Sequence, residues 1–156
     1  MELYLVQHGE AKPEQEDPAR PLTARGREEV HRVARHAARL SRQVAEIRHS
    51  GKLRARQTAE VLAEHLRPAR GVREIEGLAP NDDPRKARTD AEAAREPLMF
   101  VGHLPHLSRL ASSLLVGDPG REIIRFRPGG LVCLGKLEGR WLLQWILTPD
   151  LVRADA

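Results

Sequence analysis

Hydrophobic residues fall into short unbroken runs that alternate with longer amphipathic stretches. The runs at residues 3–6 and 98–101 are apolar throughout, which predicts strands that are buried on both faces. Apolar side chains recur at helical spacing, opposite charged ones, over residues 24–40, 53–66 and 105–116. These stretches predict amphipathic helices. Helix 24–40 carries His31 and His36 on or near its polar face, where we expect no catalytic role.

Weaker patterns complete the order of the predicted elements. They indicate a short polar helix at 84–95 and further strands at 44–49, 72–75, 123–126, 131–137 and 140–147. Glu138 and Gly139 predict a tight hairpin turn between the last two strands. Strands that alternate with helices and end in an antiparallel hairpin are typical of an α/β protein. We therefore expect a single domain, residues 1–156, with three α/β/α layers around a mixed, mostly parallel sheet.

The composition of the chain indicates which kinds of ligand or partner it can bind. The chain has 156 residues, of which 40% are hydrophobic and 31% are charged, and its formal net charge is +4. Arginine supplies most of the positive charge, and its planar guanidinium suits phosphate or carboxylate. Aromatic residues make up only 3%, too few for a base-stacking platform, so we expect no nucleic-acid partner.

Cysteine usage and hydropathy indicate the compartment. Cys133 is the only cysteine, which rules out an internal disulfide and a cysteine-based zinc site. No apolar run approaches the roughly 20 residues that a membrane helix needs, and the N-terminus lacks a signal-peptide pattern. We expect a cytoplasmic protein with no membrane partner.

Two histidines lie where buried strands end. His8 and Gly9 follow the first apolar run, and Gly102 and His103 follow the run at 98–101. Open α/β sheets bind ligands at the carboxyl ends of their strands, and glycine there leaves room for a ligand. Two such histidines are therefore predicted to face each other across one crevice.

An arginine also lies just after the end of a predicted strand. Arg54 is in the first turn of the helix predicted at 53–66, directly after a strand. A helix N-terminus favours an anion, and the guanidinium adds a formal charge.

An alternative to an anion site is a metal site formed by His8, His103 and His106. No carboxylate has a suitable spacing, so we expect neither a metal nor a cofactor.

Four segments follow one another along the chain: Gln7-His8-Gly9, Arg20-Pro21-Leu22-Thr23 with Gly26, residues 50–59, and Val101-Gly102-His103. In this order they resemble the histidine phosphatase superfamily, which is phosphoglycerate mutase-like, and most of all its phosphohistidine phosphatase SixA group. The resemblance implies a phosphoglycerate mutase-like fold and a phosphatase activity. It implies that His8 is the nucleophile and becomes phosphorylated, that Arg54 and His103 bind the transferred phosphoryl group, and that Arg20 lines the same pocket.

The chain departs from the family at Gln7, where arginine is usual. Glutamine still donates hydrogen bonds, so Gln7, Gly9 and Arg20 stay candidates for phosphate binding, but it brings no charge. A charge-assisted hydrogen bond contributes about 1.5–3 kcal/mol against about 1 kcal/mol for a neutral one. Glutamine at this position therefore predicts that the phosphate is stabilised less well, by about one or two orders of magnitude. A non-catalytic phosphate-binding module is an alternative function.

The substrate depends on the leaving group. Phosphohistidine leaves as an imidazole, whereas an alkyl phosphate leaves as a poor alkoxide and needs a general acid. The segment around residues 77–80 resembles the SixA type, which lacks a clear acid, so we expect a phosphohistidine-bearing protein as substrate. The alternative is a small-molecule phosphomonoesterase in which Glu76 is the acid.

Overall fold

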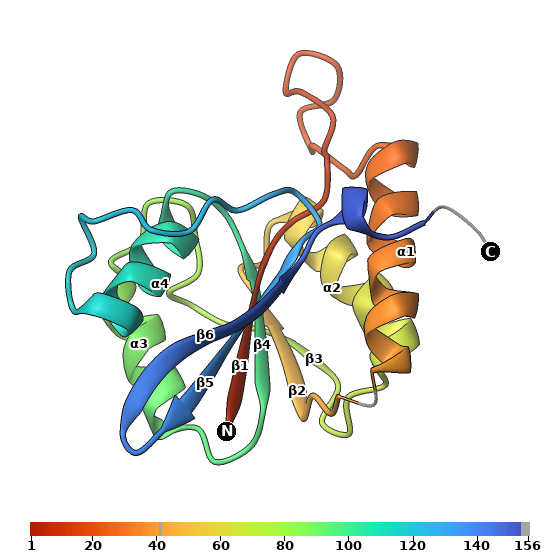
Figure 1. The fold of residues 1–156 in the computed structure, drawn as a ribbon. Coiled ribbons are helices and arrows are strands. Elements are labelled where there is room, and N and C mark those ends of the chain that lie inside the picture. The colour runs from red at the N-terminus through yellow and green to blue at the C-terminus, as the bar shows by residue number, and fades with distance from the viewer. Residues whose placement is uncertain (41, 154–156) are drawn as a thin grey trace.

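Six strands form one central sheet in the order β3-β2-β4-β1-β5-β6 (Figure 1). The computed structural model describes residues 1–40 and 42–153. The strands are β1 (Glu2–Gln7), β2 (Glu46–His49), β3 (Val72–Glu74), β4 (Leu98–Gly102), β5 (Leu131–Leu137) and β6 (Arg140–Leu147). The first four are parallel, whereas β5 is antiparallel to β1 and β6 to β5. The predicted mixed, mostly parallel sheet is confirmed.

Helices cover both faces of the sheet, which confirms the three-layer prediction (Figure 1). On one face lie α1 (Ala24–Arg39) and α2 (Leu53–Leu66), and on the other α3 (Pro84–Ala93) and α4 (His106–Val116). A short 3₁₀ helix, Pro149–Leu151, follows β6. The Thr23 side chain caps α1 by accepting a hydrogen bond from the Gly26 amide at 2.9 Å. None of the helices in the described ranges is long and apolar enough to cross a membrane.

β1 lies at the centre of the sheet and divides the core into two clusters. Leu3 and Leu5 pack with residues of α3 and α4, whereas Tyr4 and Val6 pack with residues of α1 and α2. All four side chains are buried, as the unbroken apolar run predicts. Side chains alternate between the two faces of a strand, so odd-numbered residues of β1 lie on the α3/α4 face and even-numbered residues on the α1/α2 face.

One predicted strand is absent: residues 123–126 form an irregular segment on the way to β5. The prediction was wrong because alternation alone does not create a sheet partner. Ile124 and Phe126 are buried in the α3/α4 cluster, while Ile123 and Arg125 are exposed. The alternating pattern therefore reflects a segment packed along one edge of a core. The predicted hairpin turn is confirmed, because Glu138 and Gly139 both adopt positive φ between β5 and β6.

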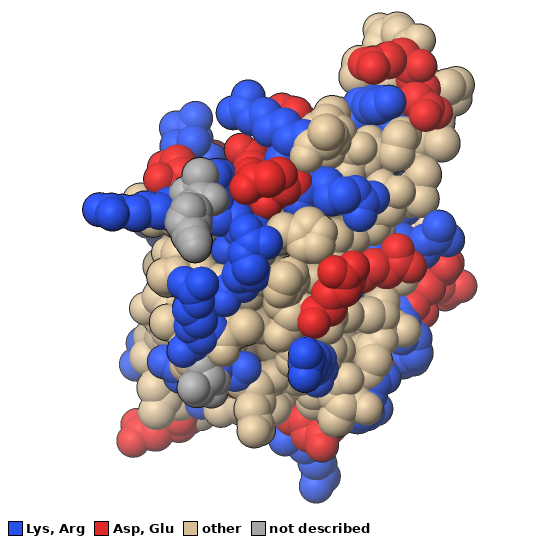
Figure 2. Space-filling view, turned by 90° about the vertical axis from the view of Figure 1, so that its right-hand side faces the viewer, with Lys and Arg blue, Asp and Glu red and all other residues tan. Residues whose placement is uncertain are grey.

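Charged side chains are interspersed on the face that α1 covers. Figure 2 shows lysines and arginines there with aspartates and glutamates between them. The positive net charge is therefore not gathered into one continuous patch on this face.

Candidate active site

His8 and His103 extend from the adjacent carboxyl ends of β1 and β4. The His8 amide donates to the Gly102 carbonyl at 3.0 Å, which continues the pairing of the two strands by one residue. Gln7 is in register with Gly102, so His8 and His103 follow at equivalent positions. Their ring centroids lie 5.0 Å apart with an angle of 54° between the ring planes. The structure thus brings together the two histidines that the sequence analysis paired.

The surroundings of His8 select one tautomer of its ring. Nδ1 lies 2.7 Å from the carbonyl oxygen of Gly9. Because a carbonyl only accepts hydrogen bonds, Nδ1 carries the proton and Nε2 keeps its lone pair. The pKa of His8 is lowered to about 4, mainly by burial and also by the charges of Arg54 and Arg20, while the bond to the Gly9 carbonyl acts in the opposite direction. Near pH 7 His8 is therefore neutral and has the electronic form of a nucleophile.

His103 is almost completely buried, with 2% of its surface exposed. Its Nε2 lies 2.6 Å from the hydroxyl of Ser50, which directly follows β2. Its Nδ1 has no hydrogen-bond partner among the described residues. Burial, followed by the charges of His8 and Arg54, lowers the pKa of His103 to about 3. A phosphate dianion beside this ring would oppose these effects and favour its charged form.

Arg54 and Arg20 bring two positive charges to the histidine pair. Arg54 lies in the first turn of α2, and its Nε is buried without a partner in the part of the chain that is described. Burial and then the charge of Arg20 lower the pKa of Arg54, which reflects how near the two guanidinium groups are. Arg20 has a φ of 49° and donates from Nε to the Lys12 carbonyl at 3.0 Å. Neither arginine forms an ion pair with a described carboxylate, so both can contact an anion.

Gly9 allows the chain to pass tightly between α1 and α2. A Cβ atom at this position would lie 2.9 Å from Cγ2 of Val30, which is too close for any larger residue to fit without displacement. The Gly9 amide donates to the Thr58 hydroxyl at 3.0 Å. That hydroxyl in turn donates to the Arg54 carbonyl at 2.8 Å. Gly9 therefore fixes His8 relative to the first turns of α2, and its amide is already committed to Thr58.

Gln7 is half-buried, and its Oε1 is buried without a described partner. By strand alternation, Gln7 points toward the same side as Leu5, whereas His8 points toward the same side as Val6. The residue paired with Gln7 is Gly102, where a Cβ atom would lie 3.2 Å from the carbonyl oxygen of Leu78, so this end of β4 is closely packed.

Glu76 is exposed and lines a cavity of about 480 Å³. Ser50, Glu74 and Lys86 line the same cavity. Because the Ser50 hydroxyl also contacts His103, this cavity adjoins the histidine pair. Glu76 is thus placed beside the site, on a surface open to solvent.

The alternative metal site requires that ligand atoms of His8, His103 and His106 lie close together. His106 is fully buried in the first turn of α4, and neither of its ring nitrogens has a described partner. Three ligand atoms come within 4.8 Å of one another in a single group of the described residues, which is formed by His31, Glu64 and His65. His8, His103 and His106 therefore do not form a ready metal cluster.

Sequence reasoning missed three residues that position the site: Ser50, Gln57 and Thr58. Gln57 accepts a hydrogen bond from the Leu22 amide at 2.8 Å and so holds the loop that carries Arg20. Ser50 follows a strand end, and the rule that identified His8 and His103 applies to it equally. For Gln57 and Thr58 the signal is weaker, because both are polar residues on the inner side of a helix.

The depressed pKa of His8 predicts how stability depends on pH. Unfolded His8 takes up a proton near its ordinary pKa of 6.5, whereas the folded protein resists until about 4. The free energy of unfolding should therefore fall as the pH is lowered from about 6.5 to 4, and His103 adds to this loss. In His8→Gln the fall over this window should be shallower, which denaturant titrations at a series of pH values measure. Equal slopes in the two proteins would contradict the assigned pKa.

Fold and site together define a class: an α/β protein with a histidine pair and two arginines at the carboxyl ends of its parallel strands. The sequence profile of the histidine phosphatase superfamily (branch 1) matches residues 3–119. The chain therefore belongs to the histidine phosphatase superfamily, which confirms the resemblance drawn from its motifs. Membership supports phosphatase chemistry on a phosphorylated substrate.

One relative and several solved structures are similar to this chain. The chain is 34% identical over 147 residues to an uncharacterized protein of Picosynechococcus sp. strain PCC 7002, covering 86% of this chain and 84% of that one. Its fold is similar to the protein histidine phosphatase SixA complexed with tungstate, with a TM-score of 0.85, 23% identity and coverage of 96% and 98%. A phosphoserine phosphatase from Entamoeba histolytica shares the fold with a TM-score of 0.70, 16% identity and coverage of 94% and 96%.

Proposed function

We propose that this protein is a phosphatase that hydrolyses phosphohistidine on a protein, through a covalent phosphohistidine intermediate on His8. One observation carries the proposal: the ring of His8 lies 5.0 Å from that of His103, with its Nδ1 held by the Gly9 carbonyl. This leaves Nε2 of His8 free to attack phosphorus. The two nearby arginines supply the positive charge that a phosphoryl group requires.

In the first step, the Nε2 lone pair of His8 forms a bond to phosphorus while the bond from phosphorus to the substrate imidazole breaks. The departing imidazole nitrogen takes a proton from solvent. Arg54 and Arg20 bind the equatorial oxygens, and His103 contributes a further donor. Catalysis in this scheme is mainly positioning and charge stabilisation, as phosphoryl transfer requires.

In the second step, water attacks the phosphorus and the bond to His8 Nε2 breaks. Inorganic phosphate leaves, and His8 returns to its neutral form with the proton on Nδ1. The water's other proton goes to solvent and replaces the one that the departing imidazole took. The net reaction is hydrolysis of a phosphorus–nitrogen bond.

Phosphohistidine is favoured over an alkyl phosphate because imidazole leaves more easily than an alkoxide, so no general acid is needed. The similarity of the fold to a protein histidine phosphatase supports the same choice. A second candidate is a small-molecule phosphomonoesterase. The observation in its favour is that Glu76 lines the cavity beside His103, where an acid would meet an alkoxide leaving group.

Substrate panels distinguish the two candidates. Turnover of a phosphohistidine protein, phosphoserine and a sugar phosphate is measured for the native protein, for Glu76→Gln and for the control Glu14→Gln, an exposed glutamate of the loop before α1. We expect the highest kcat/KM for phosphohistidine, and Glu76→Gln should change it by less than about twofold. An essential acid would instead cost about a hundredfold. A preference for the sugar phosphate that depends on Glu76 would establish the second candidate.

The third possibility, a phosphate-binding module without turnover, is motivated by Gln7. It predicts that phosphate binds while no substrate is hydrolysed and no phosphate is incorporated into the protein. Phosphate incorporation from a labelled substrate during turnover would exclude it.

A further inference from the structure

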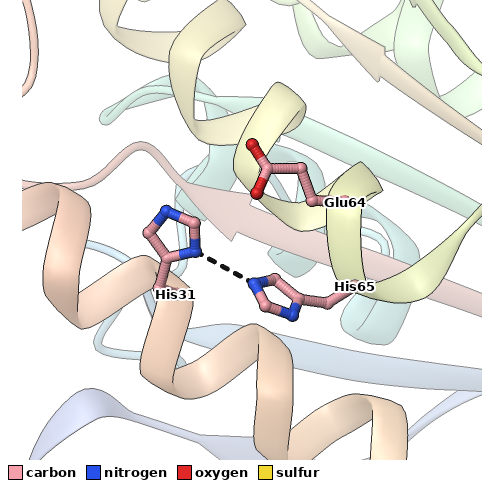
Figure 3. Close-up of side chains that lie close together, drawn as sticks. All are labelled: His31, Glu64 and His65. Atoms are coloured by element: carbon pink, nitrogen blue, oxygen red, sulfur yellow. Dashed lines mark hydrogen bonds between the residues drawn. The ribbon is translucent and has the colours of Figure 1, made fainter.

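A second cluster of histidines lies on the packed helices α1 and α2. His31 belongs to α1, and Glu64 and His65 belong to the last turns of α2 (Figure 3). The two rings point toward each other, with 2.9 Å between Nδ1 of His31 and Nε2 of His65. His65 is eleven residues from Arg54 on the same helix, or about 16 Å along its axis. This cluster is therefore separate from the candidate active site.

The donor atoms of this cluster converge. One ligand atom each from His31, Glu64 and His65 lies within 4.8 Å of the other two. The imidazole rings are nearly perpendicular, at 86°, and their centroids are 5.2 Å apart. Such a pair shares one proton, with one nitrogen donating and the other accepting. Both nitrogens become ligands once a metal ion replaces that proton.

We propose that His31, Glu64 and His65 bind one Zn²⁺ ion that ties α1 to α2. Two imidazoles and a carboxylate, with water as a fourth ligand, form a common tetrahedral donor set for zinc. Calcium and magnesium prefer oxygen ligands, which the two nitrogens do not offer. Bonds of about 2.0–2.1 Å in a tetrahedron place ligand atoms about 3.3 Å apart. The ring nitrogens, now 2.9 Å apart, would separate by about 0.4 Å and turn toward the ion, and the Glu64 carboxylate would close in from within 4.8 Å.

The local charges and burial are compatible with this ion. Both histidines are half-buried, and Glu64 is exposed. Arg35 is the cation that acts against a metal here, and Glu64 supplies an opposing negative charge.

A bound ion would act on the fold rather than on the chemistry of the active site. α1 packs over Gly9 through Val30, and α2 carries Arg54 and Thr58. Joining the middle of α1 to the last turns of α2 would restrict their relative movement. The ion's effect is therefore expected in stability, which gives a readout that is independent of phosphatase activity.

The experiment follows thermal unfolding of the chelator-stripped full-length protein with and without Zn²⁺. At a free zinc concentration about a hundredfold above Kd, Tm should rise by about 5–10 °C. His31→Ala and His65→Ala should abolish this rise, and Glu64→Gln should weaken zinc binding by at least about tenfold. His36→Ala, which removes another histidine of α1, should keep it. Co²⁺ should give one equivalent of tetrahedral visible absorption that is lost in the same variants.

Each variant is compared with itself, with and without zinc, so lower stability of a variant does not obscure the result. Absence of zinc binding by the native protein would show that the histidines form only a hydrogen bond, and would overturn the proposal. A zinc response that survives in the His31→Ala/His65→Ala double variant would also overturn it. Loss of that response in His8→Gln instead would assign the metal to the active site.

Discussion

His8→Ala is expected to lower turnover of every phosphorylated substrate by at least about a thousandfold and to abolish phosphate incorporation into the protein. The reason is that His8 Nε2 provides the lone pair that forms the covalent bond in the proposed mechanism. The fold should persist, because His8 contributes its backbone amide to the pairing with Gly102, and alanine retains that amide. Initial rates and mass spectrometry of the quenched reaction measure both quantities.

His36→Ala is the matched control for this experiment. His36 is a half-buried histidine of α1 that takes no part in the described site, so its loss should leave both turnover and phosphate incorporation unchanged. Circular dichroism and thermal unfolding establish that the His8 variant is folded. A folded His8→Ala protein with normal turnover would rule out His8 as the nucleophile.

Gln7→Arg is expected to raise turnover of a generic phosphoryl substrate by up to about a hundredfold. Arginine brings a charge and five N–H donors, where glutamine brings two. Residue 7 is the last residue of β1 and directly precedes His8, and related histidine phosphatases usually carry arginine at this position. We expect the longer side chain to reach the phosphate beside His8, where it would stabilise the charge of the transition state.

Arg20 decides how large that gain is. Its charge already lowers the pKa of His8 and of Arg54, so it lies close enough to supply part of what Gln7 lacks. Turnover and inorganic-phosphate affinity are therefore measured for Gln7→Arg, Arg20→Ala and the double variant. The gain from arginine at position 7 should be larger in the Arg20→Ala background. If neither quantity changes in either background, residue 7 does not face the phosphate.

Local patterns were sufficient to locate most elements of this fold. The apolar runs of β1 and β4 are buried on both faces, and such runs occur where helices cover both sides of a sheet. The segment 123–126 shows where this reasoning fails. Its alternation of buried and exposed residues is the same in a strand and in an irregular segment packed on a core, and only the presence of a neighbouring strand separates the two.

The candidate site was predictable to the extent that it lies at strand ends. His8 and His103 could be proposed because each lies beside a glycine just after a buried apolar run, a pattern that is visible in one stretch of sequence. Their distance, the tautomer of His8 and the contact with Ser50 required the sheet, since β1, β2 and β4 are far apart along the chain and adjacent in space.

The pair formed by His31 and His65 depends on tertiary structure alone. From the sequence, His31 is a histidine near the polar face of one helix, and nothing in that pattern indicates a partner 34 residues away. The chain itself specifies the two amphipathic helices, because their apolar stripes are local and must be buried. Which polar residues meet at the rim of these stripes is decided only when α1 and α2 pack side by side on the sheet, because the crossing of the helices sets their relative register.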